Sequence, residues 1–392
     1  MKTYVCGAGI SKGAGYPLGI ELFDELDQFV RSAGPCVNRF DYSKDWPALK
    51  RWLGRHKNPV VAEAYRSRQL EHLFTVFDLA WKLRVDALGA VLTASKRGKR
   101  AVAAAERAWK NLVTTTDSYQ RYRQILMWAL EAYLEHKHSR DRAEDGGPAW
   151  EYLRVFGSKL CPGDTVLTFN YDSPLERVLW LQKKWSPLDG TGFEMAFQRS
   201  RSDIPVEFPV SQIKVLHLHG SVGWYRKPTF SPDFEPKEEG GEVPPEALAP
   251  GPMSTPIAFD PIFLRDLDIS AVDSSLSRRP ASESQVMLHP SFVKDYELVG
   301  AQNTFTTLWR HAADALRSAD EVVVIGYGLP EADSAALTLL ISNCHPRKVT
   351  IINRNKQTNF RLQHLLKSGS GRHWIALPPV SLQQWLDDTP DC

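Results

Sequence analysis

The chain has 392 residues, a length typical of about two domains. Its 48 Lys and Arg nearly balance its 46 Asp and Glu, leaving a net charge of +2. That balance argues against a protein devoted to nucleic acid, which would carry a strong basic excess, so no direct nucleic-acid binding is expected. Charged residues at 24% and hydrophobic residues at 43% exclude a wholly disordered chain.

The five cysteines are widely spaced and contain no C-x-x-C pair. This spacing argues against a disulfide scaffold and a structural zinc site, so no metal is expected. No run reaches the roughly 18 uncharged apolar residues of a membrane span, and the first apolar run starts at Tyr4, which leaves no room for a signal peptide. We therefore expect a cytoplasmic protein without a membrane partner.

Six short apolar runs follow one another along the chain, and five of them are followed directly by Gly, Asn or His. They span residues 4–6, 165–169, 213–218, 321–325, 349–352 and 374–377. Short β-branched runs bounded by turn residues are typical of strands buried on both faces. Helical stretches such as 305–319 and 330–343 lie between several of them. The sequence therefore predicts an α/β fold with a Rossmann-like, doubly wound parallel sheet of about six strands.

Two long segments interrupt the predicted sheet. Residues 21–155 are rich in helix formers, with breakers such as Gly146-Gly147-Pro148 between the helical stretches, and indicate an inserted helical subdomain. Residues of about 226–290 are rich in Pro and Gly and predict a loop or lid with little regular structure. The sheet domain would then comprise residues 1–20 and 156–392.

Ligands of doubly wound sheets bind beyond the carboxyl ends of the strands. The first run leads into Gly7-Ala8-Gly9, with Ser11 close behind. Glycines let the backbone approach a pyrophosphate, and a following helix N-terminus offers its N–H groups. The spacing G-x-G-x-x-x-G differs from the dinucleotide fingerprint, which disfavours an ordinary NAD dehydrogenase. A tight strand–helix turn without a ligand is the alternative.

Asn170 ends the second run and Asp172 follows it. An Asn at a strand end can orient a water or a ribose hydroxyl, and Asp172 would support it. The alternative is helix capping, because Asp172 or Ser173 directly before Pro174 suits an N-cap.

His219 follows the third run, beside Gly220 and Ser221. An imidazole titrates near neutral pH, so His219 is the candidate general base. The alternative is a core histidine with satisfied hydrogen bonds. His217 lies two residues earlier and could pair with His219 around a metal, but no third ligand is evident.

Two later strand ends complete the candidate site. Gly326 and Tyr327 follow the fourth run, where a glycine could admit a phosphate, and Asn353 follows the fifth, where a second ribose or base edge could dock. Plain turns are the alternatives. The basic stretch 96–100 is interpreted as a solvated loop.

In this order the motifs resemble those of the sirtuin (silent-information-regulator-two) superfamily. The matching segments are 7–11, 15–17, 170–172, 218–220, 326–329 and 352–353. The resemblance spans residues 1–20, 160–225 and 310–356. Residues 169–172, 219–224, 290–294 and 326–333 are similar to the prokaryotic sirtuin-like branch, although Gly328 stands where that branch usually has Ser.

Two departures bear on the activity that the resemblance implies. Protein-deacylating sirtuins carry a zinc module with two Cys pairs, which this chain lacks, and Leu18-Gly19-Ile20 replaces their Asp-Phe-Arg. The resemblance is therefore to members that hydrolyse NAD+ to nicotinamide and ADP-ribose, commonly as effectors of antiphage defence. It implies a homo-oligomer, with a co-encoded hexameric DNA-translocating ATPase or another activator as a partner.

The resulting hypothesis is an NAD+ glycohydrolase whose catalytic residues are Asn170, Asp172 and His219. The residues expected to hold the dinucleotide are Gly7, Ala8, Gly9, Ser11, Gly220, Ser221, Gly326, Tyr327 and Asn353. The alternatives are a module that binds NAD or ADP-ribose without cleaving it, a structural subunit of a larger assembly, and an ADP-ribosyltransferase or protein deacylase.

Overall fold

The structure is a computed structural model of the whole chain. It describes residues 1–32, 36–37, 40–56, 59–79, 118–134, 136–137, 147–193, 196–198, 209–226, 263–265, 284–288, 290, 302–328, 330, 333–344, 348–370 and 382–390.

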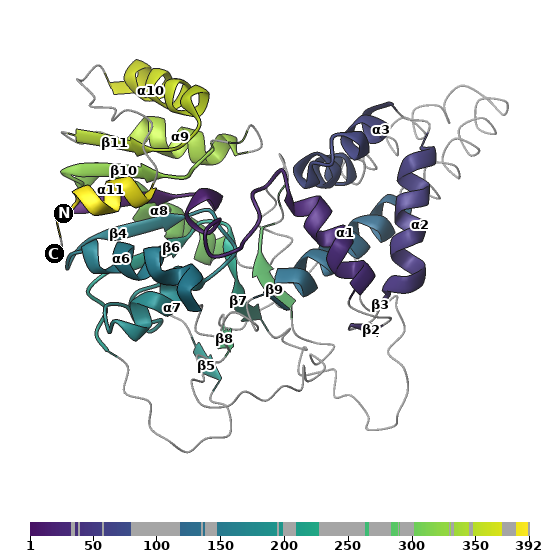
Figure 1. Cartoon of the computed structure of the whole chain (residues 1–392), viewed down its shortest axis with the longest axis horizontal. Coiled ribbons are helices and arrows are strands. Elements are labelled where there is room, and N and C mark those ends of the chain that lie inside the picture. The colour runs from purple at the N-terminus through teal and green to yellow at the C-terminus, as the bar shows by residue number, and fades with distance from the viewer. Residues whose placement is uncertain are drawn as a thin grey trace, which may run out of the picture.

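A five-stranded parallel sheet forms the centre of the fold (Figure 1). Its order is β11 (Lys348–Ile352), β10 (Glu321–Ile325), β1 (Lys2–Cys6), β4 (Thr165–Thr168) and β6 (Lys214–His217). The chain moves outward from β1 through β4 to β6, then returns to the other side of β1 as β10. The strand order therefore reverses between β1 and β10, where doubly wound folds open a crevice.

This arrangement confirms the predicted α/β fold with a parallel sheet, although the described sheet has five strands. The sixth predicted strand, 374–377, lies outside the described residues.

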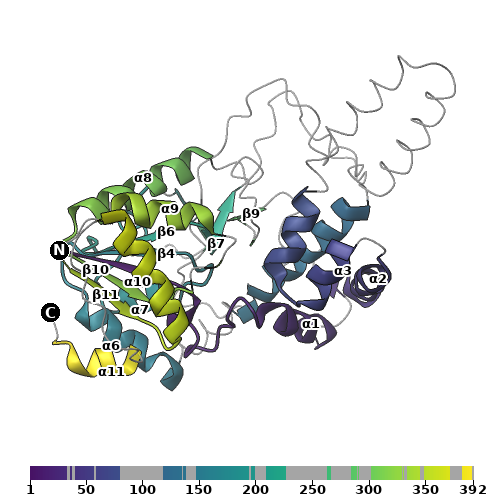
Figure 2. The same ribbon diagram turned by 90° about the horizontal axis from the view of Figure 1, so that it is seen from above.

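Helices pack on both faces of this sheet, since successive strand side chains point to opposite sides. Val5, Leu167 and Val324 face α8 (Gln302–Ser318), α9 (Ser334–Asn343) and α10 (Lys356–Ser370). Tyr4, Val166 and Val323 face α6 (Glu151–Lys159), α7 (Pro174–Leu181) and α11 (Leu382–Asp388). Figure 2 shows α8 and α9 on one side of the strands and α6 and α11 on the other.

A second group of helices packs around its own hydrophobic core beside the carboxyl edge of the sheet (Figure 1). We call this group the helical cluster. It consists of α1 (Leu22–Ser32), α2 (Tyr42–Arg55), α3 (Pro59–Arg66) and the helical stretches 70–79 and 118–134. All of them come from the segment predicted to be helical, and the short strands β2 (Cys36–Val37) and β3 (Phe40–Asp41) pair beside α2. The short helix η3 (Gly147–Trp150) leads into α6. The assignment of 21–155 as a separate subdomain stays a prediction.

The chain also forms a four-stranded sheet. Its order is β5 (Ala196–Gln198), β8 (Phe263–Arg265), β7 (Gly220–Arg226) and β9 (Ser284–Met287). Strands β7 and β9 lie between the parallel sheet and the helical cluster (Figure 1). Val222 of β7 and Met287 of β9 are buried in the core of the helical cluster. Within the predicted loop 226–290, the structure describes the short strands β8 and β9, and most of the rest of this segment lies outside the described residues. Both strands pair with β7 through their backbones. The local Pro- and Gly-rich composition does not show this pairing.

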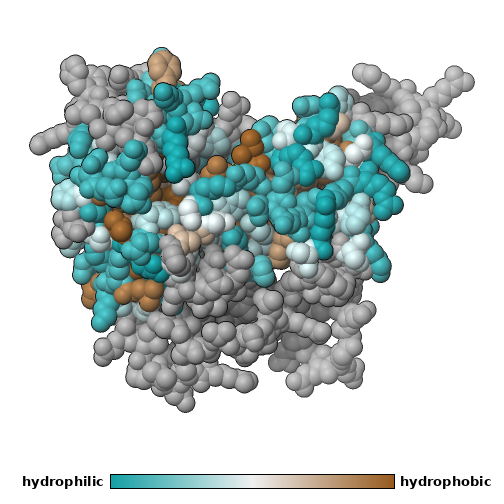
Figure 3. Space-filling model, in the orientation of Figure 1, coloured by the Kyte–Doolittle hydropathy of each residue, from teal (hydrophilic) through white to brown (hydrophobic). Residues whose placement is uncertain are grey.

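The described surface is mostly polar on the side shown in Figure 3. Its exposed large hydrophobic residues come from separate segments: Met1, Ile20, Val60, Leu79, Leu181, Leu188, Val210 and Phe360. In the part of the chain that the structure describes, no helix has both the length and the apolar character needed to span a bilayer.

Candidate functional site

Two turns pack backbone to backbone where β1 and β10 end. The Gly7 N–H donates to the Ile325 carbonyl and the Gly9 N–H to the Gly326 carbonyl, both at 3.0 Å. A Cβ at Gly7 would lie 2.6 Å from the Tyr327 Cα, and one at Gly9 would lie 2.6 Å from the Gly326 Cα. Gly326 also has a φ of +58°, which L side chains rarely adopt. The close approach of the two turns therefore requires these glycines.

The same contacts limit what the first turn, η1 (Ala8–Ile10), can offer a phosphate. Besides Gly7 and Gly9, the N–H groups of Ile10 and Ser11 donate to the carbonyls of Gly7 and Ala8. Within the described residues, the Ala8 N–H is the amide of this turn that takes no part in these bonds. Packing alone explains the glycines, so phosphate binding by this turn stays a prediction.

We expect Gly9→Ala to lower the free energy of unfolding by about 1–3 kcal/mol, the usual range for overpacking a tight contact. Denaturant unfolding measures this change. Gly54→Ala is the matched control, because the added Cβ would lie 3.8 Å from Tyr65 within a helix, where Ala is favoured over Gly. Equal stability of Gly9→Ala and the parent chain would contradict the proposed contact.

A chain of hydrogen bonds ties the end of β4 to the first turn. The Asn170 side-chain amide donates to the Gly7 carbonyl and to the Ser11 hydroxyl, both at 3.1 Å. The Ser11 hydroxyl donates to the Asp172 carboxylate at 2.7 Å. Asn170 and Ser11 are buried, whereas Asp172 is partly exposed. The structure thus brings together four residues that the sequence singled out: Gly7, Ser11, Asn170 and Asp172.

A buried ion pair lies next to this chain. One ring nitrogen of His217, Nδ1, lies 3.0 Å from the Asn170 carbonyl oxygen, and the other, Nε2, contacts the Glu176 carboxylate. Both partners can accept a hydrogen bond, which favours a hydrogen on each ring nitrogen and therefore the imidazolium form. Burial opposes that charge, but Glu176 outweighs burial and raises the pKa of His217 above its usual value. His217 therefore supports the Asn170 backbone, as expected of a core histidine with satisfied hydrogen bonds.

Enclosure by the protein raises the pKa of Asp172 to about 7, although the Ser11 hydroxyl favours its charged form. The Glu176 carboxylate adds to the rise, and the His217 imidazolium opposes it. Asp172 therefore changes its charge close to neutral pH. It precedes rather than forms the N-cap of α7, which is Ser173 followed by Pro174 at the first turn.

The raised pKa of Asp172 predicts a pH-dependent stability. Between about pH 4, where an unfolded Asp titrates, and pH 7, the folded state holds a proton that the unfolded state has lost. This group therefore makes folding less favourable as the pH rises through that window. We expect Asp172→Asn to raise the free energy of unfolding relative to the parent chain. This increase should be about 1–3 kcal/mol larger at pH 8 than at pH 5. Thermal unfolding at both pH values tests this, with the exposed Asp314→Asn as control. An equal gain at both pH values would contradict it.

His219 lies beside this hydrogen-bonded group and is itself buried, with 5% of its surface exposed. Its ring centre is 5.2 Å from that of Phe169 and 6.3 Å from that of Tyr171, the two residues that flank Asn170. Phe169 also stacks on Tyr327 at 4.7 Å. Aromatic contacts therefore join the ends of β4, β6 and β10 into one region.

The sequence analysis missed a carboxylate in this region, that of Asp333. Its Oδ1 lies 3.2 Å from Nε2 of His219, and its Oδ2 accepts the Tyr327 hydroxyl at 2.8 Å. Asp333 is the N-cap residue of α9, yet its side chain makes no capping hydrogen bond. The available sequence signal, an Asp shortly before a helix, is read most simply as a cap.

The helical cluster contributes a second missed carboxylate, Glu71. A Cβ at Gly19 would lie 3.8 Å from its Oε1, so this carboxylate lies against the segment that leaves the first turn. Burial, with Glu71 and then Asp333, raises the pKa of Tyr171 well above its usual value. Burial, Asp333 and Glu71 act in the same direction on Tyr327. The Tyr hydroxyls here are therefore neutral donors, and Glu71 lies close enough to act on both.

Three further candidates have packing roles. Gly220 has a φ of +80°, and a Cβ there would lie 2.1 Å from the Val286 carbonyl oxygen. Ser221 is buried and its hydroxyl accepts the Gly223 N–H at 3.3 Å. The Asn353 side chain donates to the Tyr327 carbonyl at 3.2 Å and accepts the Asn355 N–H at 3.0 Å, as in a turn. The structure explains each locally, and their ligand contacts stay predictions.

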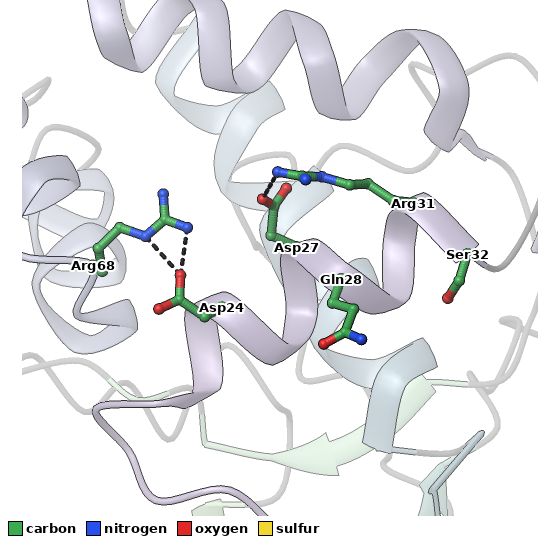
Figure 4. A pocket seen from close by; sticks show the side chains of 6 residues that line it. All are labelled: Asp24, Asp27, Gln28, Arg31, Ser32 and Arg68. Carbon is green, nitrogen blue, oxygen red and sulfur yellow. Dashed lines mark hydrogen bonds and ion pairs between the residues drawn. The ribbon is translucent and has the colours of Figure 1, made fainter.

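A separate cavity of about 520 Å³ lies on the helical cluster (Figure 4). It contains none of the predicted site residues. Its lining consists of Asp24, Asp27, Gln28, Arg31, Ser32 and Arg68. The carboxylates pair with the arginines, Asp24 with Arg68 and Asp27 with Arg31.

Among the described residues, His, Cys, Asp and Glu side chains form no group of three or more that could hold a metal ion. Comparison of the chain with protein-family models and with curated proteins finds no match.

Proposed function

We propose that the chain is a sirtuin-like NAD+ glycohydrolase that cleaves NAD+ to nicotinamide and ADP-ribose. The observation that carries the proposal is the convergence of Asn170, Asp172 and His219 at the carboxyl edge of the sheet, beside the reversal of strand order. These residues supply a carboxamide, a carboxyl group that titrates near pH 7 and a buried imidazole. Such groups are suited to acting on a water molecule and a ribose.

The reaction breaks the bond between the nicotinamide nitrogen and the ribose C1′. The leaving group of NAD+ is already cationic, so nicotinamide departs neutral with the bonding electrons and needs no general acid. An oxocarbenium-like ribose results, which nearby carboxylates stabilise, and water adds to C1′. We assign Asn170 to the orientation of this water or of the ribose, with Asp172 in support. His219 would accept the proton that the water or a ribose hydroxyl loses.

The rest of the proposal depends on the resemblance in the sequence. It includes pyrophosphate binding at the first turn, and Gly326, Tyr327 and Asn353 near the adenosine half. It also includes a cytoplasmic homo-oligomer that depletes NAD+ during antiphage defence, with a hexameric DNA-translocating ATPase as its partner.

Chromatography of NAD+ incubated with the purified chain tests the activity. We expect equal amounts of nicotinamide and ADP-ribose. NAD+ that binds, as calorimetry would show, yet stays intact would contradict the proposal.

That outcome would favour the second candidate, a module that binds NAD or ADP-ribose without cleaving it. The amides of Gly7 and Gly9 and the side chain of Asn353 are engaged within the protein, and this observation instead favours a structural subunit of a larger assembly. The first turn would then serve mainly to pack the end of β1 against the end of β10.

A further inference from the structure

We infer that Asp333 is a positioning residue that fixes the tautomer and orientation of the His219 ring. The inference rests on the proposed function, because it gives His219 a task that depends on its protonation. It also specifies which ring nitrogen of His219 carries the hydrogen, and this can be tested without any activity.

The geometry of the Asp333 carboxylate indicates that it positions the His219 ring rather than capping a helix. Asp333 is the N-cap of α9, and its backbone carbonyl accepts the Leu337 N–H, but its side chain makes no capping bond. Instead the two carboxylate oxygens divide between His219 Nε2 and the Tyr327 hydroxyl. Only 3% of the surface of Asp333 is exposed. A cap would face the helix N-terminus, whereas this carboxylate is turned toward the ring.

The pairing has a defined consequence for the ring. At 3.2 Å from Nε2, the negative Oδ1 favours the tautomer with a hydrogen on Nε2 by its charge, and the lone pair of the neutral ring then lies on Nδ1. When the ring takes up a proton, the adjacent negative charge stabilises the imidazolium. Asp333 would therefore favour proton transfer to His219 without touching the substrate.

Among the residues that the structure describes, the other polar groups near His219 do not supply this charge. Tyr171 lies at 6.3 Å between ring centres, and Tyr327 reaches the site through its bond to Asp333. Both hydroxyls are neutral, because their pKa values are raised.

Glu71 acts on these two hydroxyls from the helical cluster. His217, on the same segment as His219, is paired with Glu176. Among the described residues, Asp333 is the charged group that the structure places in contact with the His219 ring.

Kinetics of nicotinamide release by Asp333→Asn test the inference. We expect kcat to fall about 100-fold with little change in KM, because the residue acts through His219. The acid limb of the kcat–pH profile should move to lower pH, because the charge that favours the imidazolium is gone. Tyr327→Phe, which keeps the ring stacked on Phe169, should lose less than about 10-fold. Asp320→Asn, an exposed carboxylate paired with the N-terminus, should behave as the parent chain.

The outcomes separate the inference from the proposed function. A parent chain without nicotinamide release would overturn the function. A working parent with an unchanged kcat and pH profile in Asp333→Asn would overturn the inference alone. A lowered kcat with an unmoved acid limb and a large loss of thermal stability would mark Asp333 as structural and also overturn it.

A readout independent of activity completes the test. Nitrogen-15 NMR of the histidine rings should assign the hydrogen of neutral His219 to Nε2 in the parent chain, with loss of that preference in Asp333→Asn. A parent ring with its hydrogen on Nδ1 would contradict the inference.

Discussion

His219→Ala is expected to lose about 100- to 10,000-fold in nicotinamide release, the contribution of a positioned general base. Binding of NAD+ should persist, because the hydrogen bonds among Gly7, Ser11, Asn170 and Asp172 do not involve this ring. Single-turnover release at saturating NAD+ gives the rate, and calorimetry gives the affinity.

His364→Ala is the matched control, since this exposed histidine lies on α10. It should leave both quantities unchanged. A His219→Ala variant that cleaves NAD+ at the parental rate would remove the base assignment, and one that no longer binds NAD+ would show that the ring supports binding instead.

Asn170→Ala is the second variant with a large expected effect. It removes the donor that links the Gly7 carbonyl to the Ser11 hydroxyl, and with it the group assigned to orient the water or the ribose. Loss of one positioned hydrogen-bonding group of this kind typically costs about 100- to 1,000-fold in kcat. We expect a loss of that size in nicotinamide release.

Asn343→Ala is its control, because Asn343 lies at the far end of α9 and its side chain bonds to Leu339 and Arg317. Circular dichroism of both variants at the assay temperature establishes that they are folded. Parental turnover in folded Asn170→Ala would contradict the role assigned to the carboxamide.

The parallel sheet could be predicted because its signal is local. Val322, Val323 and Val324 sit in a short β-branched run with turn residues after it, and burial on both faces follows from that pattern. Asn170 and His219 follow β4 and β6, and these strand ends lie at one edge of the sheet because parallel strands share their direction.

The contacts that the sequence did not predict depend on residues distant along the chain. Gly9 packs against Gly326, more than 300 residues away, a contact that its glycine-rich motif does not show. Asp333 has the sequence features of a cap, and only the fold shows that its carboxylate meets His219. Glu71 carries no local signal at all, because its helix reaches the site only when the helical cluster packs beside the sheet.

The central claim is that one dinucleotide site lies at the carboxyl edge of the sheet. Hydrogen exchange with and without carba-NAD, in which a methylene replaces the ring oxygen of the nicotinamide ribose and prevents cleavage, tests it most directly. We predict slower exchange at residues 7–15, 168–172, 217–221 and 326–328. Protection confined to α1 and Arg68, around the cavity of the helical cluster, would contradict the claim.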